Sequence, residues 1–244
     1  MKVKALITAA GMGRRFGALT RRTNKCLLKV EGKPLVCHIL DKLRARRVTE
    51  VYLISGYGSR DVERVVDGRA SVVFNPFYRV SGILGSFWAA RPHLDGKAFL
   101  FTTADHFFHP SVLQGCLRGT TDLRIVVQRK KRYTKEDAKV TIRASEVTRL
   151  GKDLPSLDAD GEFCGMVYFS PKASRLFFRE LQSQFEKGDL GGYMMDILKV
   201  LRQKYSLPIR YSLCAENMRI EIDSVHDLIA ARRLAKLFKG GKTR

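Results

Sequence analysis

Residues 9–35 read AAGMGRRFGALTRRTNKCLLKVEGKPL, and the other segments of the chain are best understood from this stretch. The apolar run 5–10 that leads into it predicts a buried strand. Gly11 and Gly13 then allow a tight turn that brings backbone N–H groups close to an anion. Cations follow the turn at Arg14, Arg15, Arg21, Arg22, Lys25 and Lys29. Because arginine binds phosphate oxygens in bidentate fashion and lysine supplies a movable point charge, the stretch predicts a polyphosphate-binding loop.

The composition of the 244-residue chain is that of an ordinary globular protein, with 45% hydrophobic and 28% charged residues. No apolar run approaches the ~18 residues that a membrane-spanning helix needs. We expect no signal peptide, because Lys2 and Lys4 lead directly into the first strand. The five widely spaced cysteines form no CxxC pair, which predicts reduced thiols and a cytoplasmic location.

The formal net charge is +21, from 45 Lys and Arg against 24 Asp and Glu. Such an excess attracts nucleic acid, anionic membranes or acidic small substrates, and it also fits a plain solvated basic surface. The cations are spread along the whole chain, so the sequence does not favour a dedicated nucleic-acid-binding role.

Apolar strands alternate with helices in the first half of the chain. Strands are predicted over 51–55, 70–74 and 97–104, and helices over 34–48, over 59–66 with Ser59 as N-cap, and from 86 onward. This alternation predicts a mainly parallel sheet covered by helices, with ligands at the carboxyl ends of the strands. Both the glycine turn and Asp105 fall at such ends.

The second half contains more strands with short connections. They are predicted over 123–128, 163–169, 209–213 and 218–222, with a hairpin formed by 138–143 and 146–150. Helices are predicted over 171–185, over 193–203 and from 224. We expect a single α/β domain over 1–238, followed by a basic tail over 239–244.

Glycines and cations in the opening stretch have a fixed spacing: Gly11-x-Gly13-x-Arg15, Thr20, Lys25, Leu27-Leu28 and Gly32-Lys33-Pro34-Leu35. This spacing resembles the signature of the nucleotidyltransferases that build nucleoside-diphosphate sugars and alcohols. It is not a P-loop, because no GK[ST] motif closes it. Asn24 stands where many members of that family have proline.

The resemblance implies a Rossmann-like nucleotidyltransferase fold with a nucleotide-binding half over 1–120, an acceptor-binding half over 121–223 and a C-terminal helix over 224–238. It also implies that Arg15 binds the β- and γ-phosphates and that Lys25 binds the α-phosphate. Fixed cations there would stabilise the charge that develops during attack at the α-phosphorus. The base and ribose would be held by Ala9, Ala10, Gly11, Met12 and Gly13.

Two strand-end aspartates are candidates for a metal site. The family has an aspartate at the positions of Asp105 and Asp223, so the resemblance implies that both bind Mg²⁺, which prefers oxygen ligands. Glu221 would then face the acceptor. Without the resemblance, an aspartate at the end of a strand is more often a helix N-cap than a metal ligand. His106 and His109 lie three residues apart, but no third nitrogen or sulfur ligand is evident and we expect no transition-metal site.

Segments 75–90 and 161–170 resemble the small cytidylyltransferases that act on phosphocholine, 2-aminoethylphosphonate or inositol-1-phosphate. This resemblance implies that Ser81 and Ser86 contact the nucleotide, although Gly82-Ile83 replaces the paired asparagines of the phosphocholine type. Segment 150–154 is closer to the inositol-phosphate enzymes, so the acceptor markers are mixed. Residues expected to contact the acceptor are Lys139, Lys152, Glu162, Asp196 and Glu221.

The sequence as a whole predicts a Mg²⁺-dependent cytidylyltransferase whose partners are CTP and a small phosphorylated or phosphonate acceptor. One alternative is a hexose-1-phosphate nucleotidylyltransferase that uses UTP, dTTP or GTP. An alternative of another class is a non-catalytic relative that binds nucleotides or nucleic acid. The basic helix from 224 is also a candidate for contact with an anionic membrane.

Overall fold

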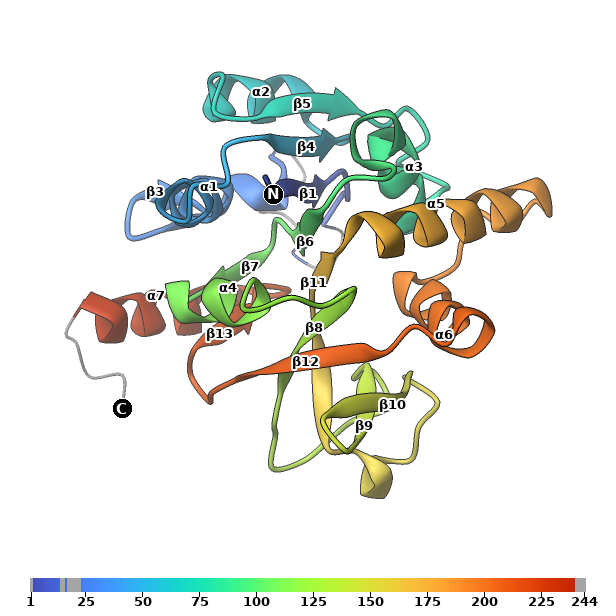
Figure 1. Cartoon of the computed structure of the whole chain (residues 1–244). Helices are drawn as coiled ribbons and strands as arrows, with labels where there is room; N and C mark the ends of the chain where they lie inside the picture. Colours follow the sequence, from blue (N-terminus) through green and yellow to red (C-terminus); the bar gives the residue numbers. More distant parts are fainter. Residues whose placement is uncertain (1, 14–15, 17–22, 240–244) are drawn as a thin grey trace.

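The computed structural model describes residues 2–13, 16 and 23–239 (Figure 1). The predicted phosphate ligand Arg15, its neighbour Arg14, and Arg21 and Arg22 lie outside the described residues, as does the end of the predicted basic tail.

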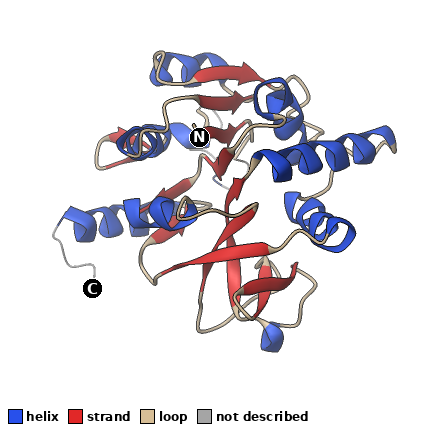
Figure 2. Ribbon diagram, viewed as in Figure 1, coloured by secondary structure: helices blue, strands red, loops and turns tan. Residues whose placement is uncertain are grey.

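A nine-stranded sheet runs through the molecule (Figure 2). Its parallel centre consists of β6 (Phe99–Thr103), β1 (Lys4–Ala9), β4 (Val51–Ser55) and β5 (Ser71–Phe74), in this spatial order. Thr8 of β1 is paired with Thr103 of β6, so the two strands end side by side. The glycine turn and Asp105 therefore emerge at the same edge of the sheet, as predicted.

Antiparallel strands extend the sheet on the other side of β6. β11 (Gly161–Phe169) pairs with β6, and the predicted hairpin β9 (Lys139–Arg143) and β10 (Glu146–Gly151) continues beyond it. β8 (Leu123–Gln128) also pairs with β11, and β12 (Ile209–Cys214) runs parallel to β8. The α/β fold class is confirmed. One sheet thus contains strands from both predicted halves, and the boundary between those halves stays a prediction.

Helices cover both faces of the sheet because the strand residues alternate between them. On one face Leu6, Ile54 and Phe101 pack beneath α3 (Gly82–Leu94), α5 (Pro171–Glu186) and α6 (Met194–Tyr205). On the other face Ile7 and Leu53 pack beneath α1 (Leu35–Ala45), α2 (Ser59–Val66) and α4 (Pro110–Cys116). In Figure 1, α3, α5 and α6 lie to the right of the central strands, and α1, α4 and α7 (Val225–Lys239) lie to the left.

Short elements complete the chain. β2 (Lys29–Val30) pairs with β3 (Lys33–Pro34), and the 3-10 turns η2 and η3 span Lys25–Leu27 and Ser156–Asp158. The ladder of β7 (His106–Phe108) with β13 (Arg219–Glu221) places the end of β13 beside the end of β6. β7 was not predicted, and it has a direct consequence for the site.

Two local predictions were wrong. The N-cap of α2 is Gly58, whose φ of 65° is left-handed and favours glycine. Ser59 is the first helical residue, and its hydroxyl instead lies 2.8 Å from that of Ser55. α3 begins at Gly82, earlier than the predicted 86, because the turn over 75–81 folds directly into the helix.

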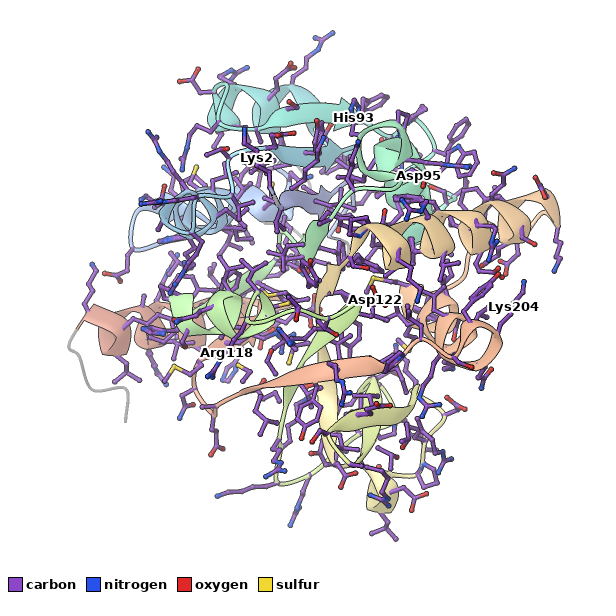
Figure 3. The ribbon with its side chains drawn as sticks, viewed as in Figure 1. Lys2, His93, Asp95, Arg118, Asp122 and Lys204 are labelled. Atoms are coloured by element: carbon purple, nitrogen blue, oxygen red, sulfur yellow. The ribbon has the colours of Figure 1, made fainter. Side chains whose placement is uncertain are left out.

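Basic side chains come from many parts of the fold. The labelled cations Lys2, Arg118 and Lys204 precede β1, follow α4 and lie at the end of α6 (Figure 3). All three are exposed. This spread agrees with the even distribution of cations along the sequence.

Candidate active site

A pocket of about 270 Å³ lies where β1 and β6 end. The predicted site residues that line it are Ala9, Gly11, Gly13, Lys25, Asp105 and Asp223. These residues come from four separate places in the sequence. The fold therefore brings the glycine turn, the lysine and both carboxylates together at one pocket.

Lys25 lies between the two aspartates. Its Nζ is 2.8 Å from Asp105 Oδ2 and 2.5 Å from Asp223 Oδ1. Burial alone would lower the pKa of Lys25, but the two carboxylates outweigh burial and raise that pKa above its usual value. Burial opposes ionisation of Asp105, and the charge of Lys25 outweighs it and lowers the pKa of that carboxyl. The lysine is therefore an ammonium held by carboxylates.

The β7–β13 ladder delivers Asp223 to this position. Glu221 is paired with His106, and the backbone N–H of Ile222 donates to the carbonyl of Asp105 at 3.0 Å. The carboxylate of Asp227 then accepts from the backbone N–H of Asp223, which fixes the entry into α7. Asp105 and Asp223 are thus held by backbone contacts as well as by Lys25.

The chemistry of this site fits a hard divalent cation. Asp105 Oδ1 is buried and has no hydrogen-bond partner among the described residues, so it is open to a metal ligand bond. Carboxylate oxygens of Asp105 and Asp223 line the pocket beside the lysine, a Glu221 oxygen lies within 4.8 Å of Asp105, and oxygen is the donor that Mg²⁺ prefers. The residues present therefore suit Mg²⁺.

His106 lies in the same cluster, within 4.8 Å of ligand atoms of Asp105 and Glu221. Its Nε2 is 3.1 Å from a guanidinium nitrogen of Arg219. Because a guanidinium only donates, Nε2 accepts this hydrogen bond and is not free to bind a metal. Arg219 also pairs with Glu221 at 3.1 Å, so His106 and Glu221 hold a buried arginine between them.

Strand order shows where some of the predicted acceptor residues lie relative to Asp105. β6 lies between β1 and β11, so β11 borders Asp105 on the side away from the glycine turn. Glu162, near the start of β11, forms a 2.6 Å ion pair with Lys130. The charge of Arg219 acts on both Glu162 and Glu221. Of these two predicted acceptor residues, Glu221 lies within 4.8 Å of Asp105, and neither glutamate lines the 270 Å³ pocket.

Lys139 has a different environment from the one predicted. Its side chain is only 1% exposed, and its ammonium donates to the carbonyls of Thr134, Asp137 and Lys152 at 3.0, 3.3 and 2.7 Å. These three bonds use every donor of the ammonium. The contacts do not support binding of an acceptor phosphate by Lys139, and they indicate that it holds the loop between β8 and β9.

The other two predicted acceptor residues lie away from the pocket lining. Lys152 pairs with Glu136 at 3.3 Å, and its ammonium lies over the ring of Tyr193. Asp196 pairs with Lys199 at 3.0 Å and caps the start of α6 through the backbone N–H of Tyr193. Their roles toward the acceptor stay predictions.

The remaining predicted nucleotide contacts are not part of the pocket lining. Ser81 is buried and donates to the carbonyl of Phe77 at 2.8 Å, and Ser86 is buried within α3. Ala10 is buried behind the turn, and Met12 is half-buried. Neither serine lines the 270 Å³ pocket, so their contact with a base also stays a prediction.

Several residues that shape the site were not singled out from the sequence. Phe16 is buried, and its ring lies 5.9 Å from Lys25 Nζ. Arg219 and Lys130 hold the two acceptor-side glutamates. Asn24 is buried next to Lys25 and bonds to two other segments. Of these residues, only Asn24 stood out in the sequence, because many members of the family that the chain resembles have proline at its position.

Residues 5–203 match the family model of the MobA-like NTP transferase domain. A CMP-5'-(3-aminopropyl)phosphonate synthase from Streptomyces rubellomurinus is 34% identical over 117 residues, which are 46% of this chain and 18% of that protein. A 2-aminoethylphosphonate cytidylyltransferase from Lancefieldella rimae is 29% identical over 126 residues, 48% of this chain and 51% of that protein. The match thus spans about half, or less, of the length of these relatives.

Among solved structures, the inositol-1-phosphate CTP transferase from T. maritima has a TM-score of 0.79 with this chain at 19% identity. The similarity covers 99% of this chain and 98% of that one. At this identity the likeness shows a shared fold.

Proposed function

Because the chain belongs to the MobA-like NTP transferase family, we propose that its pocket transfers a nucleotidyl group from CTP to a small phosphorylated or phosphonate acceptor. Family membership confirms the resemblance to nucleotidyltransferases and makes the chain a transferase enzyme. The observation that carries the proposal is the position of Lys25, between two strand-end carboxylates and beside the glycine turn.

In the proposed reaction an acceptor oxygen attacks the α-phosphorus of the nucleotide and pyrophosphate leaves. The attacking phosphate or phosphonate oxygen is already ionised at neutral pH, so no general base is needed. Lys25, whose raised pKa keeps it charged, would stabilise the negative charge that develops at the α-phosphate. Asp105 and Asp223 would hold Mg²⁺, which supplies further positive charge at the reacting phosphate when bound.

The acceptor class rests on the relatives, because Glu162 and Glu221 already pair with Lys130 and Arg219 and would have to exchange these cations for an ammonium on the acceptor. Two relatives are named for aminoalkylphosphonate substrates, which carry an ammonium group as well as an anionic group. We therefore favour a phosphonate or phosphate that bears an amine over a hexose-1-phosphate.

Contact of α7 with an anionic membrane remains a separate prediction. The helix exposes Val225, Ile229 and Leu237, and basic residues lie between them. Across the described part of the chain, no helix has the length and apolar character required to cross a bilayer.

The test is pyrophosphate release with Mg²⁺ from each of CTP, UTP, GTP, ATP and dTTP. The acceptor panel contains 2-aminoethylphosphonate, phosphocholine, inositol-1-phosphate and hexose-1-phosphates. Turnover with CTP and an amine-bearing acceptor supports the proposal. Turnover only with a hexose-1-phosphate and another nucleotide would refute it.

A further inference from the structure

Three segments that form the pocket meet beneath it. They are the end of β1, the turn 56–58 after β4, and η2, which begins with Lys25. The backbone N–H of Tyr57 donates to the carbonyl of Ala10 at 3.1 Å. A Cβ on Gly56 would lie 2.8 Å from that same carbonyl oxygen, so only glycine allows this close approach. The turn and the glycine loop are therefore in direct backbone contact.

Asn24 ties the third segment to the other two. Its Nδ2 donates to the carbonyls of Ala9 and Tyr57, both at 2.7 Å, and its Oδ1 accepts from the backbone N–H of Cys26 at 2.9 Å. The side chain is 2% exposed. Both amide hydrogens and the amide oxygen are used, and the reverse orientation would place the oxygen against two carbonyls. The amide is thus held in one orientation by three segments.

We propose that Asn24 is a positioning residue that acts on nucleotidyl transfer through Lys25. This inference rests on the proposed function. Lys25 follows Asn24 directly, and the amide fixes the start of η2 relative to the carbonyl of Ala9, at the end of the strand that leads into the glycine turn. The distance between the lysine and the phosphate-binding turn is set by this tie.

The size of the effect follows from geometry. A misplacement of about 1 Å at a reacting group costs on the order of 100-fold in rate. Asn24 borders the pocket, but it is only 2% exposed and its amide is fully hydrogen-bonded within the protein, so its loss changes the rate by moving the lysine and not by removing a contact with the substrate. We therefore expect a large effect on kcat and a small effect on the KM of the acceptor.

Two substitutions distinguish the effect of the Asn24 side-chain amide from the effect of its backbone conformation. Asn24 has φ −70° and ψ 140°, values that proline adopts without strain. Asn24→Pro retains this backbone conformation and removes all three side-chain hydrogen bonds. Asn24→Ala removes the same hydrogen bonds without introducing proline. It replaces Asn24→Pro as the test if the proline ring disturbs the preceding residue. Ser174→Ala is the matched control, because it removes a buried side-chain hydrogen bond to the carbonyl of Leu94, between α5 and α3.

The first measurement is steady-state kinetics together with Tm. We expect Asn24→Pro and Asn24→Ala to lower kcat about 10- to 100-fold, with the KM of the acceptor within about threefold of wild type. Ser174→Ala should lower Tm and leave kcat unchanged. If Asn24→Pro retains wild-type kcat, backbone shape is sufficient and the proposal is wrong.

The second measurement is a double-mutant cycle on the Kd of CTP, measured by calorimetry, with Asn24→Ala and Lys25→Met. If Asn24 acts through the lysine, the double variant binds CTP no more weakly than Lys25→Met alone. Additive losses would overturn the inference. This cycle needs no acceptor. A wild type that binds CTP but transfers nothing therefore refutes the proposed function alone, whereas a wild type that binds no CTP refutes both.

Discussion

Substitution of Lys25 by methionine should tighten metal binding in the absence of nucleotide. The lysine ammonium occupies the space between Asp105 and Asp223, at 2.8 and 2.5 Å from their oxygens, so a divalent cation must compete with it for the same ligands. Methionine keeps most of the side-chain volume and removes the charge. The ammonium that lies between the two carboxylates is then gone, and its place becomes available to a metal.

The magnitude follows from the hydrogen bonds that the metal no longer has to break. A hydrogen bond to a charged group contributes about 1.5–3 kcal/mol. If metal entry displaces one of the two hydrogen bonds of Lys25, replacement of the lysine should lower the metal Kd roughly 10- to 150-fold, since about 1.4 kcal/mol corresponds to a factor of ten. Repulsion between the lysine and a dication adds to this effect in the same direction.

Mn²⁺ provides the assay, because free Mn²⁺ is measured directly by its electron paramagnetic resonance signal. Titrations of wild type and Lys25→Met are compared without nucleotide, and Tm checks that both proteins are folded. Lys33→Met is the control, because it removes a lysine paired with Asp41 of α1, outside the residues that line the pocket. An Mn²⁺ affinity that is unchanged or weaker in folded Lys25→Met would refute the reasoning.

Three further predictions concern other buried charges. Asp105→Asn should raise the Mg²⁺ concentration needed for half-maximal turnover by at least about tenfold, and an unchanged requirement would remove this residue from the metal site. Burial lowers the pKa of Lys42 from 10.5 to about 8, beneath the rings of Phe107 and Phe108. Between pH 8 and 10.5 the unfolded chain binds more protons than the folded protein, so the free energy of unfolding should rise with pH from about 8 to 10.5. Lys42→Met should abolish this rise and stabilise the protein at pH 7 by about 1–3 kcal/mol, as measured by urea titration. Lys139→Met should lower the free energy of unfolding by about 1–3 kcal/mol because it leaves buried carbonyls unpaired, and a raised acceptor KM at unchanged stability would instead restore its predicted role.

The parallel centre of the fold could be predicted because its signal is local. Continuous apolar runs gave the bounds of β4 correctly and placed β1, β5 and β6 within one or two residues. Strands of this kind are buried on both faces, so every residue contributes to the pattern. The prediction that the glycine turn and Asp105 lie at the same edge of the sheet needs only the direction of the two strands that precede them.

The β7–β13 ladder could not be predicted in the same way. Each strand has only three residues, and the pairing of His106 with Glu221 joins distant parts of the chain. The sequence predicted a strand over 218–222, which contains β13, but the three residues of β7 have no periodic pattern, so the pairing was not predicted. Asp223 was assigned to the site through its resemblance to a family motif, and the physical reason for its position appears only in the ladder and in the contact of Ile222 with Asp105.

Lys139 illustrates a second limit of sequence reasoning. A lysine on a hairpin strand is usually solvated, and the resemblance placed it near the acceptor phosphate. The carbonyls that enclose its ammonium come from a loop and from Lys152, and none of them has a side-chain signature. Because any residue supplies a backbone carbonyl, a buried lysine of this type is visible only in three dimensions.

The charge balance of the site connects the Lys25 prediction to the order of binding. Among the residues that the structure describes, Asp105, Asp223 and Glu221 face Lys25 and Arg219 next to the pocket, in a chain whose net charge is +21. A metal that entered alone would approach the ammonium of Lys25. A triphosphate that enters with its metal offers the ammonium a phosphate and offers the carboxylates a dication at the same time. If Lys25→Met tightens metal binding as expected, the wild-type lysine therefore couples the two events, and the metal should bind far more tightly with nucleotide than without it.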